Sequence, residues 1–166
     1  MRLAPRADWH VMADSGSTWY RKGLRFECTR CGNCCTGPPG AVWFTPQEGE
    51  AMAQALGVDL STFLSRYARK IRGGWSLQER RSPQGMDCIF LTRDEQGRAG
   101  CSVYAARPTQ CRTWPFWDEN LESPEAWDDA RERTPCPGMG EGPLISVESI
   151  ISRLNQDAST NAGPST

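Results

Sequence analysis

The sequence has few of the features that identify common enzyme and membrane classes. It contains one histidine, His10, and no H-E-x-x-H pattern, so a hydrolytic zinc enzyme is disfavoured. No apolar run approaches the roughly 18 residues of a membrane-spanning helix, and residues 1–14 carry charges without an apolar signal region. We therefore expect a cytoplasmic protein that makes no membrane contact.

The sequence also lacks an excess of charge of either sign. It has 19 basic and 20 acidic residues, for a net charge of −1, so no global field favours nucleic acid or an anionic membrane as a partner. All the basic residues except Lys22 and Lys70 are arginines. Guanidinium groups are permanently charged, forked donors, and this bias fits an anionic centre.

Cysteine is abundant, in contrast, and it is clustered. Four of the eight cysteines fall within eight residues, and the other four follow at long intervals: Cys28, Cys31, Cys34 and Cys35, then Cys88, Cys101, Cys111 and Cys136. Two intervening residues let thiolates from one tight turn converge on a zinc ion or an iron–sulfur cluster. We take all eight as candidate metal ligands.

A framework of four disulfides is the alternative reading of eight cysteines. Such frameworks belong mostly to short secreted chains, whereas cytosolic thiols are kept reduced. The adjacent Cys34 and Cys35 also argue against it, because neighbouring Cα atoms stand about 3.8 Å apart, below the usual disulfide range. Metal ligation is the stronger reading.

The pattern of helices and strands predicts one small, irregular α+β domain that is rich in loops around the metal site. We expect a loosely ordered N-terminal arm over residues 1–22, a cysteine-cluster domain over 23–156 and a disordered tail over 157–166. The capping box Thr45-Pro-Gln-Glu48 predicts a helix over 46–56 that ends at Gly57. Apolar spacing predicts a second helix from residue 59 or 61 to 71.

Strands are expected in the middle of the chain, followed by short helices. Alternating residues predict strands over 75–80 and 87–92, and the turn at 94–97 predicts a hairpin that returns through 99–104. Pro108 is placed to open a short helix, near whose N-terminus the dipole would stabilise a Cys111 thiolate. We expect residues 118–129 to form a solvated acidic loop and a helix to run from Ser146 through Leu154.

The spacing leaves the arrangement of metal centres open. Eight thiols can form one four-cysteine site with four bystanders, two such sites, or a binuclear site with shared sulfur. On an extended backbone Cys34 and Cys35 would point to opposite faces, so that one serves each of two centres or one is a bystander. Nearby arginines are candidates for balancing the thiolate charge: Arg25, Arg30, Arg107 and Arg112. Trp114, Phe116 and Trp117 would supply apolar cover.

Cysteine-centred motifs recur through residues 24–142. They are Cys28-x-x-Cys31-Gly-x-Cys34-Cys35, Cys88-Ile-Phe-Leu, Gly100-Cys101-Ser-Val-Tyr104, Arg107-Pro-x-x-Cys111-Arg112 with Trp114-Pro-Phe116, and Cys136-Pro-Gly-x-Gly. Together they resemble the YkgJ-type CxxCxxCC cysteine-cluster family. The resemblance implies a zinc- or iron-chelating domain, also described as an iron–sulfur-cluster-containing protein and related to flagellin N-methylases, with all eight cysteines at matched positions.

Two functional hypotheses follow. The first is a cytoplasmic metal-binding protein that chelates iron, as an iron–sulfur cluster, or zinc, for storage, delivery or structure. The second is an enzyme, either an iron–sulfur oxidoreductase or a protein resembling flagellin N-methylases. No nucleophile and base pair, phosphate loop or dinucleotide fingerprint marks a catalytic site, so the enzyme question stays open. The sequence names no protein partner.

Overall fold

The computed structural model describes residues 18–161. Most of the predicted arm, including His10, and residues 162–166 of the predicted tail lie outside these residues. The fold is mixed α+β with several small antiparallel sheets, as predicted. The helices are α1 (Pro46–Leu56), α2 (Leu60–Tyr67), α3 (Thr109–Thr113), α4 (Asp118–Leu121), α5 (Pro124–Arg133) and α6 (Val147–Asn161), with 3₁₀ turns η1 (Asn33–Cys35) and η2 (Tyr104–Ala106).

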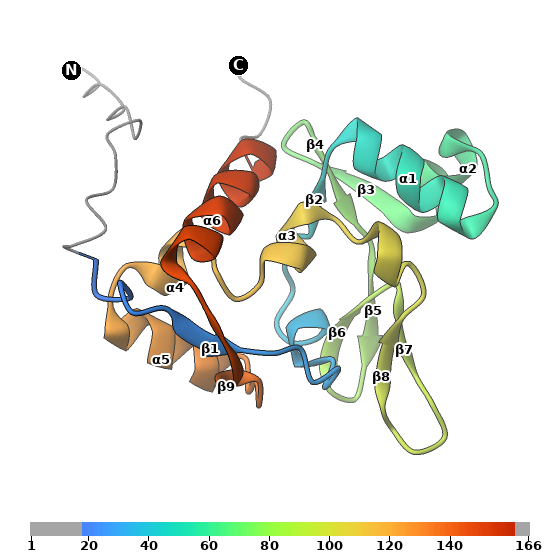
Figure 1. Cartoon of the computed structure of the whole chain (residues 1–166). Coiled ribbons are helices and arrows are strands. Elements are labelled where there is room, and N and C mark those ends of the chain that lie inside the picture. The colour runs from blue at the N-terminus through green and yellow to red at the C-terminus, as the bar shows by residue number, and fades with distance from the viewer. Residues whose placement is uncertain (1–17, 162–166) are drawn as a thin grey trace, which may run out of the picture.

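The strands pair in four antiparallel sheets, which are β1–β9, β2–β4–β3, β5–β6 and β7–β8. Their bounds are β1 (Leu24–Phe26), β2 (Trp43–Phe44), β3 (Ala68–Ile71), β4 (Gly74–Leu77), β5 (Glu79–Ser82), β6 (Gly85–Cys88), β7 (Leu91–Arg93), β8 (Ala99–Cys101) and β9 (Met139–Ile145). Figure 1 shows two halves with α3 between them. We call β1, α4, α5, β9 and α6 the terminal half, and β2 to β8 with α1 and α2 the central half.

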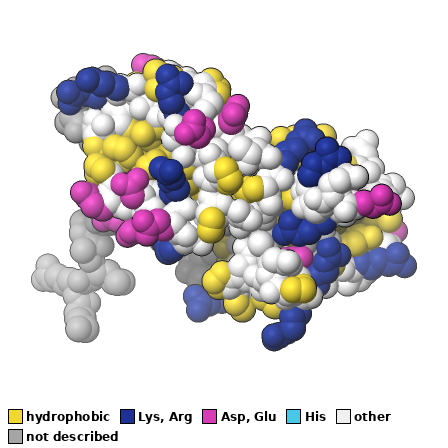
Figure 2. Space-filling view, turned by 90° about the horizontal axis from the view of Figure 1, so that it is seen from below, with side chains coloured by type: hydrophobic (Ala, Val, Ile, Leu, Met, Phe, Trp, Pro, Cys, Tyr) yellow, Lys and Arg dark blue, Asp and Glu magenta, His cyan; other side chains and the backbone are white. Residues whose placement is uncertain are grey.

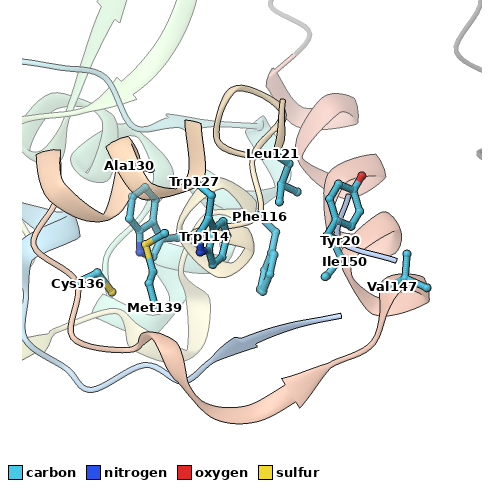
Figure 3. Close-up of a cluster of buried hydrophobic side chains, with 10 residues drawn as sticks. All are labelled: Tyr20, Trp114, Phe116, Leu121, Trp127, Ala130, Cys136, Met139, Val147 and Ile150. Atoms are coloured by element: carbon cyan, nitrogen blue, oxygen red, sulfur yellow. The ribbon is translucent and has the colours of Figure 1, made fainter. Parts of the chain in front are cut away.

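Each half has its own hydrophobic core. The terminal core, drawn in Figure 3, consists of Tyr20, Trp114, Phe116, Leu121, Trp127, Ala130, Cys136, Met139, Val147 and Ile150. The central core consists of Phe44, Met52, Ala53, Phe63, Ala68, Leu77, Phe90 and Val103, with Cys88 and Cys101 packed against it. Cys136 therefore belongs to the terminal core, whereas Cys88 and Cys101 lie at the edge of the central core.

Helix α1 confirms the capping-box prediction at both ends. The Thr45 hydroxyl accepts a hydrogen bond from the Glu48 amide at 3.2 Å, and the Glu48 carboxylate accepts one from the Thr45 amide at 2.9 Å. Gly57 ends the helix in the left-handed conformation. These interactions are local, which is why the sequence was enough to predict them.

Helix α2 ends at Tyr67, four residues before the predicted end. Residues 68–71 form β3 instead, which pairs with β4 through a tight turn at Arg72 and Gly73, both at positive φ. The Arg69↔Ser76 and Lys70↔Trp75 pairs lie within this hairpin. Strand pairing thus overrides the helical spacing of the segment.

Both predicted central strands are interrupted. Residues 75–80 divide between β4 and β5 at Gln78, whose side-chain amide donates to the Ala68 carbonyl at 3.0 Å. Residues 87–92 divide between β6 and β7, because the chain turns there and the amides of Phe90 and Leu91 donate to the Cys88 sulfur. The break in this strand is therefore a turn around a thiol.

The terminal half contains the other differences from prediction. The expected acidic loop over 118–129 is helical in α4 and α5, because the Ser123 hydroxyl caps α5 and both Trp127 and Ala130 are buried against the core. Helix α6 continues past Leu154 to Asn161. Trp19 donates to the Leu121 carbonyl at 2.8 Å, so the described end of the predicted arm is anchored.

Candidate metal centre

All eight cysteines line one cavity of about 330 Å³. They come from the loop after β1, from η1, from the ends of β6 and β8, from α3 and from the segment before β9. Apolar side chains of both halves, among them Phe26, Val42 and Leu91, complete the wall. Segments more than 100 residues apart in the sequence thus deliver thiols to a single apolar space.

The loop of Cys28 and Cys31 is shaped by glycine. Gly32 has a positive φ of 78° and precedes η1, and a Cβ on it would stand 2.5 Å from the Ala99 Cβ of β8. Only a residue without a side chain allows this close approach. The glycine of the Cys-x-x-Cys-Gly motif therefore lets the start of η1 pack against the β7–β8 hairpin.

The backbone at Cys34 and Cys35 is not extended, so the prediction that the two side chains point to opposite faces does not apply. They lie in the 3₁₀ turn η1, and their Sγ atoms stand 3.8 Å apart. This distance far exceeds the roughly 2.05 Å of a disulfide, and none of the eight cysteines is in a disulfide. Because the turn is helical rather than extended, the two sulfurs lie together.

Backbone amides already face two of the sulfurs. Phe90 and Leu91 donate to Cys88, and Val103 donates to Cys101. Leu91 is also the cross-strand partner of Cys101 in the β7–β8 ladder, so the two cysteines lie at the same end of this hairpin. N–H donors of this kind stabilise thiolate and tune a metal bound to it.

Burial favours the protonated form of four of the thiols when no cation is present. The hydrogen bond with Cys34, together with burial, raises the pKa of the Cys35 thiol, and burial raises the pKa of Cys88 to about 11. Burial raises the pKa values of Cys101 and Cys111 as well. For Cys111 this outweighs the expected help from the dipole of α3, which is only five residues long. Metal binding at these sulfurs must therefore release protons.

The four arginines expected near the thiols have different roles. Arg107 opposes the rise in pKa of Cys35, Cys101 and Cys111. Arg25 donates instead to the Gly142 carbonyl at 2.7 Å, and Arg112 forms an ion pair with Glu48 at 3.7 Å. Arg30 lies over the Tyr104 ring, with Arg107 over the same ring.

Sequence reasoning missed Arg93, which also acts electrostatically on Cys35 from the β7 strand. Its distance from Cys35 in the sequence concealed this role.

Figure 2 shows that Lys and Arg side chains are more numerous over the part of the visible face that lies under β5 to β8 in Figure 1. Asp and Glu gather at the opposite end of that face.

Two of the three predicted aromatic cover residues line the cavity. Trp114 and Trp117 do so, whereas Phe116 is fully buried in the terminal core. The Trp117 indole N–H donates to the Gln110 carbonyl and the Thr113 hydroxyl, at 3.1 and 3.2 Å. The buried Trp114 N–H has no hydrogen-bond partner among residues 18–161.

The donor set of this cavity fits a thiolate-bound metal. Cysteine sulfur is the preferred ligand of zinc and iron–sulfur centres, and the orphan Trp114 N–H can serve a sulfur acceptor placed in the cavity. Among residues 18–161, no three His, Cys, Asp or Glu side chains are already grouped tightly enough to hold one ion. The eight thiols line the wall of the cavity and do not converge on a single position in it.

A small α+β domain that gathers eight reduced cysteines around an apolar cavity is a cysteine-cluster protein. The chain belongs to the CxxCxxCC family, whose model is described as a "Putative zinc- or iron-chelating domain" and matches residues 27–137. This confirms the family resemblance of the sequence motifs. No solved structure matches the chain significantly. In residues 18–161, none of the helices is long and apolar enough to cross a membrane.

Proposed function

We propose that this domain chelates iron, as an iron–sulfur cluster, through its clustered cysteine thiolates, with zinc as the alternative metal. The observation that carries the proposal is the convergence of all eight cysteines on one cavity from six separate parts of the chain. The proposed ligands are the eight cysteines that line this cavity: Cys28, Cys31, Cys34, Cys35, Cys88, Cys101, Cys111 and Cys136.

The surroundings of the cavity support an anionic centre. Four thiolates on a divalent ion carry a formal charge near −2, which an apolar site tolerates only with N–H donors or cations nearby. This cavity offers the amides at Cys88 and Cys101, the Trp114 N–H and the Arg107 guanidinium. When bound, an iron–sulfur cluster would supply one-electron chemistry, whereas zinc would supply structure.

The number of thiols favours more than one metal ion over a single ion, because one tetrahedral zinc takes only four ligands. Eight thiols that line a space of about 330 Å³ offer enough ligands for more metal than one such ion. Because no three of the side chains in residues 18–161 are already placed for one ion, binding a metal would require the sulfurs to move inward and would couple binding to the folding of the domain.

Reduced thiols support the expected cytoplasmic location, where disulfides are rare. We propose a role in iron storage, delivery or structural stabilisation in that compartment. Neither nucleic acid nor a membrane is needed as a partner for it.

Anaerobic purification followed by visible spectroscopy and by iron, zinc and sulfide analysis tests the proposal. We expect a brown protein that contains iron and acid-labile sulfide, and a lower content of bound metal when Cys88 or Cys101 is replaced by serine. Ser61→Ala, on the exposed side of α2 and outside the cavity lining, is the matched control and keeps the metal. A colourless protein with stoichiometric zinc would identify zinc, and not iron, as the bound metal. A purified protein that binds neither metal would refute the proposal.

A further inference from the structure

One group of four thiols is held together by contacts of the central half. The Thr36 hydroxyl, next to Cys35, donates to the Asp87 carboxylate, next to Cys88, at 2.6 Å. The β7–β8 register and the Leu91 amide bring Cys88 and Cys101 together, as described above. We call Cys35, Cys88, Cys101 and Cys111 the inner set.

Cys111 joins the inner set through α3. The side chain of Gln110, its neighbour on α3, accepts from the Trp43 amide at 2.8 Å and donates to the Ala41 carbonyl at 3.2 Å. These bonds attach α3 to the β2 edge of the central half. Cys35 acts electrostatically on the other three, and Cys88 and Cys101 act on Cys111, so the four lie within electrostatic range of one another on the same side of the cavity.

Contacts of the terminal half position three of the remaining four thiols, and the fourth, Cys31, lies between two of them in the loop and lines the same cavity. The Glu27 amide, next to Cys28, donates to the Gly138 carbonyl at 3.2 Å, which places Cys28 beside the segment of Cys136. The Asn33 side-chain amide, next to Cys34, donates to the Pro135 carbonyl. We call Cys28, Cys31, Cys34 and Cys136 the outer set.

We propose that the two sets form two adjacent four-thiolate metal centres, one inner and one outer. This inference rests on the proposed function and deepens it by assigning the ligands. Eight cysteines supply four ligands to each of two centres, the number that zinc and cubane clusters need. Cys34 and Cys35, with sulfurs 3.8 Å apart, contribute one ligand to each centre and place the centres side by side.

The two centres differ in their access to water. Two members of the outer set, Cys28 and Cys34, are exposed, although Cys136 is buried, whereas the inner four are all partly buried. Arg93 and Arg107 also act on inner thiols. A metal in the outer centre therefore exchanges with the surroundings first, and a metal in the inner centre is retained. Such a pair consists of a resident ion and a transferable ion.

Zinc titration of the reduced apo-protein, with a coloured chelator as competitor, tests the assignment. Zn²⁺ is the probe because it takes four thiolates without a redox change. The full-length chain should bind two equivalents, one of which the chelator removes at least tenfold faster. An outer triple variant, C28S/C31S/C136S, should lose the fast equivalent alone. An inner triple variant, C88S/C101S/C111S, should lose the slow one.

The outcomes separate this inference from the proposed function. A full-length chain that binds no zinc and carries no iron refutes the proposed function. Binding of a single zinc equivalent that depends on both sets would refute the assignment of two centres and leave the proposed chelation intact. Loss of both zinc equivalents in each triple variant would have the same meaning. Because a triple variant can fail to fold, C28S alone is the deciding variant. Its side chain is exposed, and only the fast equivalent should disappear.

Discussion

The central half and the terminal half reach the same cavity by different routes. In the central half most strand pairs are hairpins between neighbours in the sequence, as from Glu79↔Cys88 to Ser82↔Gly85, and only β2 pairs with a more distant strand, β4. In the terminal half, β1 pairs with β9 from the far end of the chain, beginning with Leu24↔Ile145. Local pairing costs little loop entropy, whereas closure over such a distance costs more.

This difference indicates what a bound metal contributes to the fold. The central half has short-range contacts that support it, but the terminal half depends on closing the chain. A structural zinc site in small peptides contributes roughly 10 to 16 kcal/mol, comparable to the roughly 5 to 15 kcal/mol stability of a whole domain. Metal at the boundary should therefore stabilise the terminal half more than the central half.

Truncation of the central core should give the largest effect on this comparison. Phe63 is fully buried between Phe44 and Phe90, so Phe63→Ala leaves a cavity and should cost about 3 to 5 kcal/mol of unfolding free energy. In apo-protein, amide hydrogen exchange should show protection lost first in α1, α2 and β3.

The matched control for this variant is Phe116→Ala, an equally buried phenylalanine of the terminal core. Its loss of protection should begin in β1, β9 and α5. If both variants lose protection uniformly across the chain, the halves are a single cooperative unit and the comparison fails.

A smaller effect is expected where β1 passes the loop of Cys136. A Cβ on Gly138 would stand 1.8 Å from the Glu27 carbonyl oxygen, so Gly138→Ala must move one strand away from the other. Overpacking of this kind costs about 1 to 3 kcal/mol. Because the shift separates Cys28 from Cys136, we also expect weaker binding of outer zinc in the competition titration.

Gly40→Ala is the control for that variant, since its Cβ would meet nothing closer than 3.9 Å. Stability and zinc binding should both stay within error of the unmodified protein. Unchanged outer zinc affinity in Gly138→Ala, measured on a folded sample, would contradict the placement of Cys28 and Cys136 in one centre.

The smallest effect on stability is expected at the cavity wall. Trp114→Phe removes an indole N–H that has no partner within the described part of the chain, so apo-protein should lose only the packing of the larger ring. With an iron–sulfur cluster bound, loss of an N–H donor to sulfur should shift the reduction potential downward. Potentiometry followed by visible absorption measures this shift.

Trp117→Phe is its control, because the Trp117 N–H is already taken by Gln110 and Thr113. This variant should lose stability from the broken hydrogen bonds while the potential stays unchanged. Equal shifts of potential in the two variants would show that ring size at the cavity wall, and not the N–H, sets the potential.

Local chemistry explains which parts of the fold could be predicted from the sequence. The capping box around Thr45, the stop at Gly57 and the short helix after Pro108 depend on interactions within a few residues. The end of α2 and the break after Cys88 could not be predicted in this way. Both depend on partners elsewhere in the chain, the β4 strand and a sulfur that accepts two amides.

By itself, the sequence determined the family, the α+β class and the identity of the eight thiols, because residue type and short spacing carry that information. The tertiary structure alone decided which thiols are neighbours. Cys34 and Cys35 lie together because η1 is a turn, and the segment of Cys28 lies beside that of Cys136 because β1 pairs with β9. Long-range strand pairing leaves no trace in the spacing of cysteines, since it depends on how two separate cores pack around one cavity.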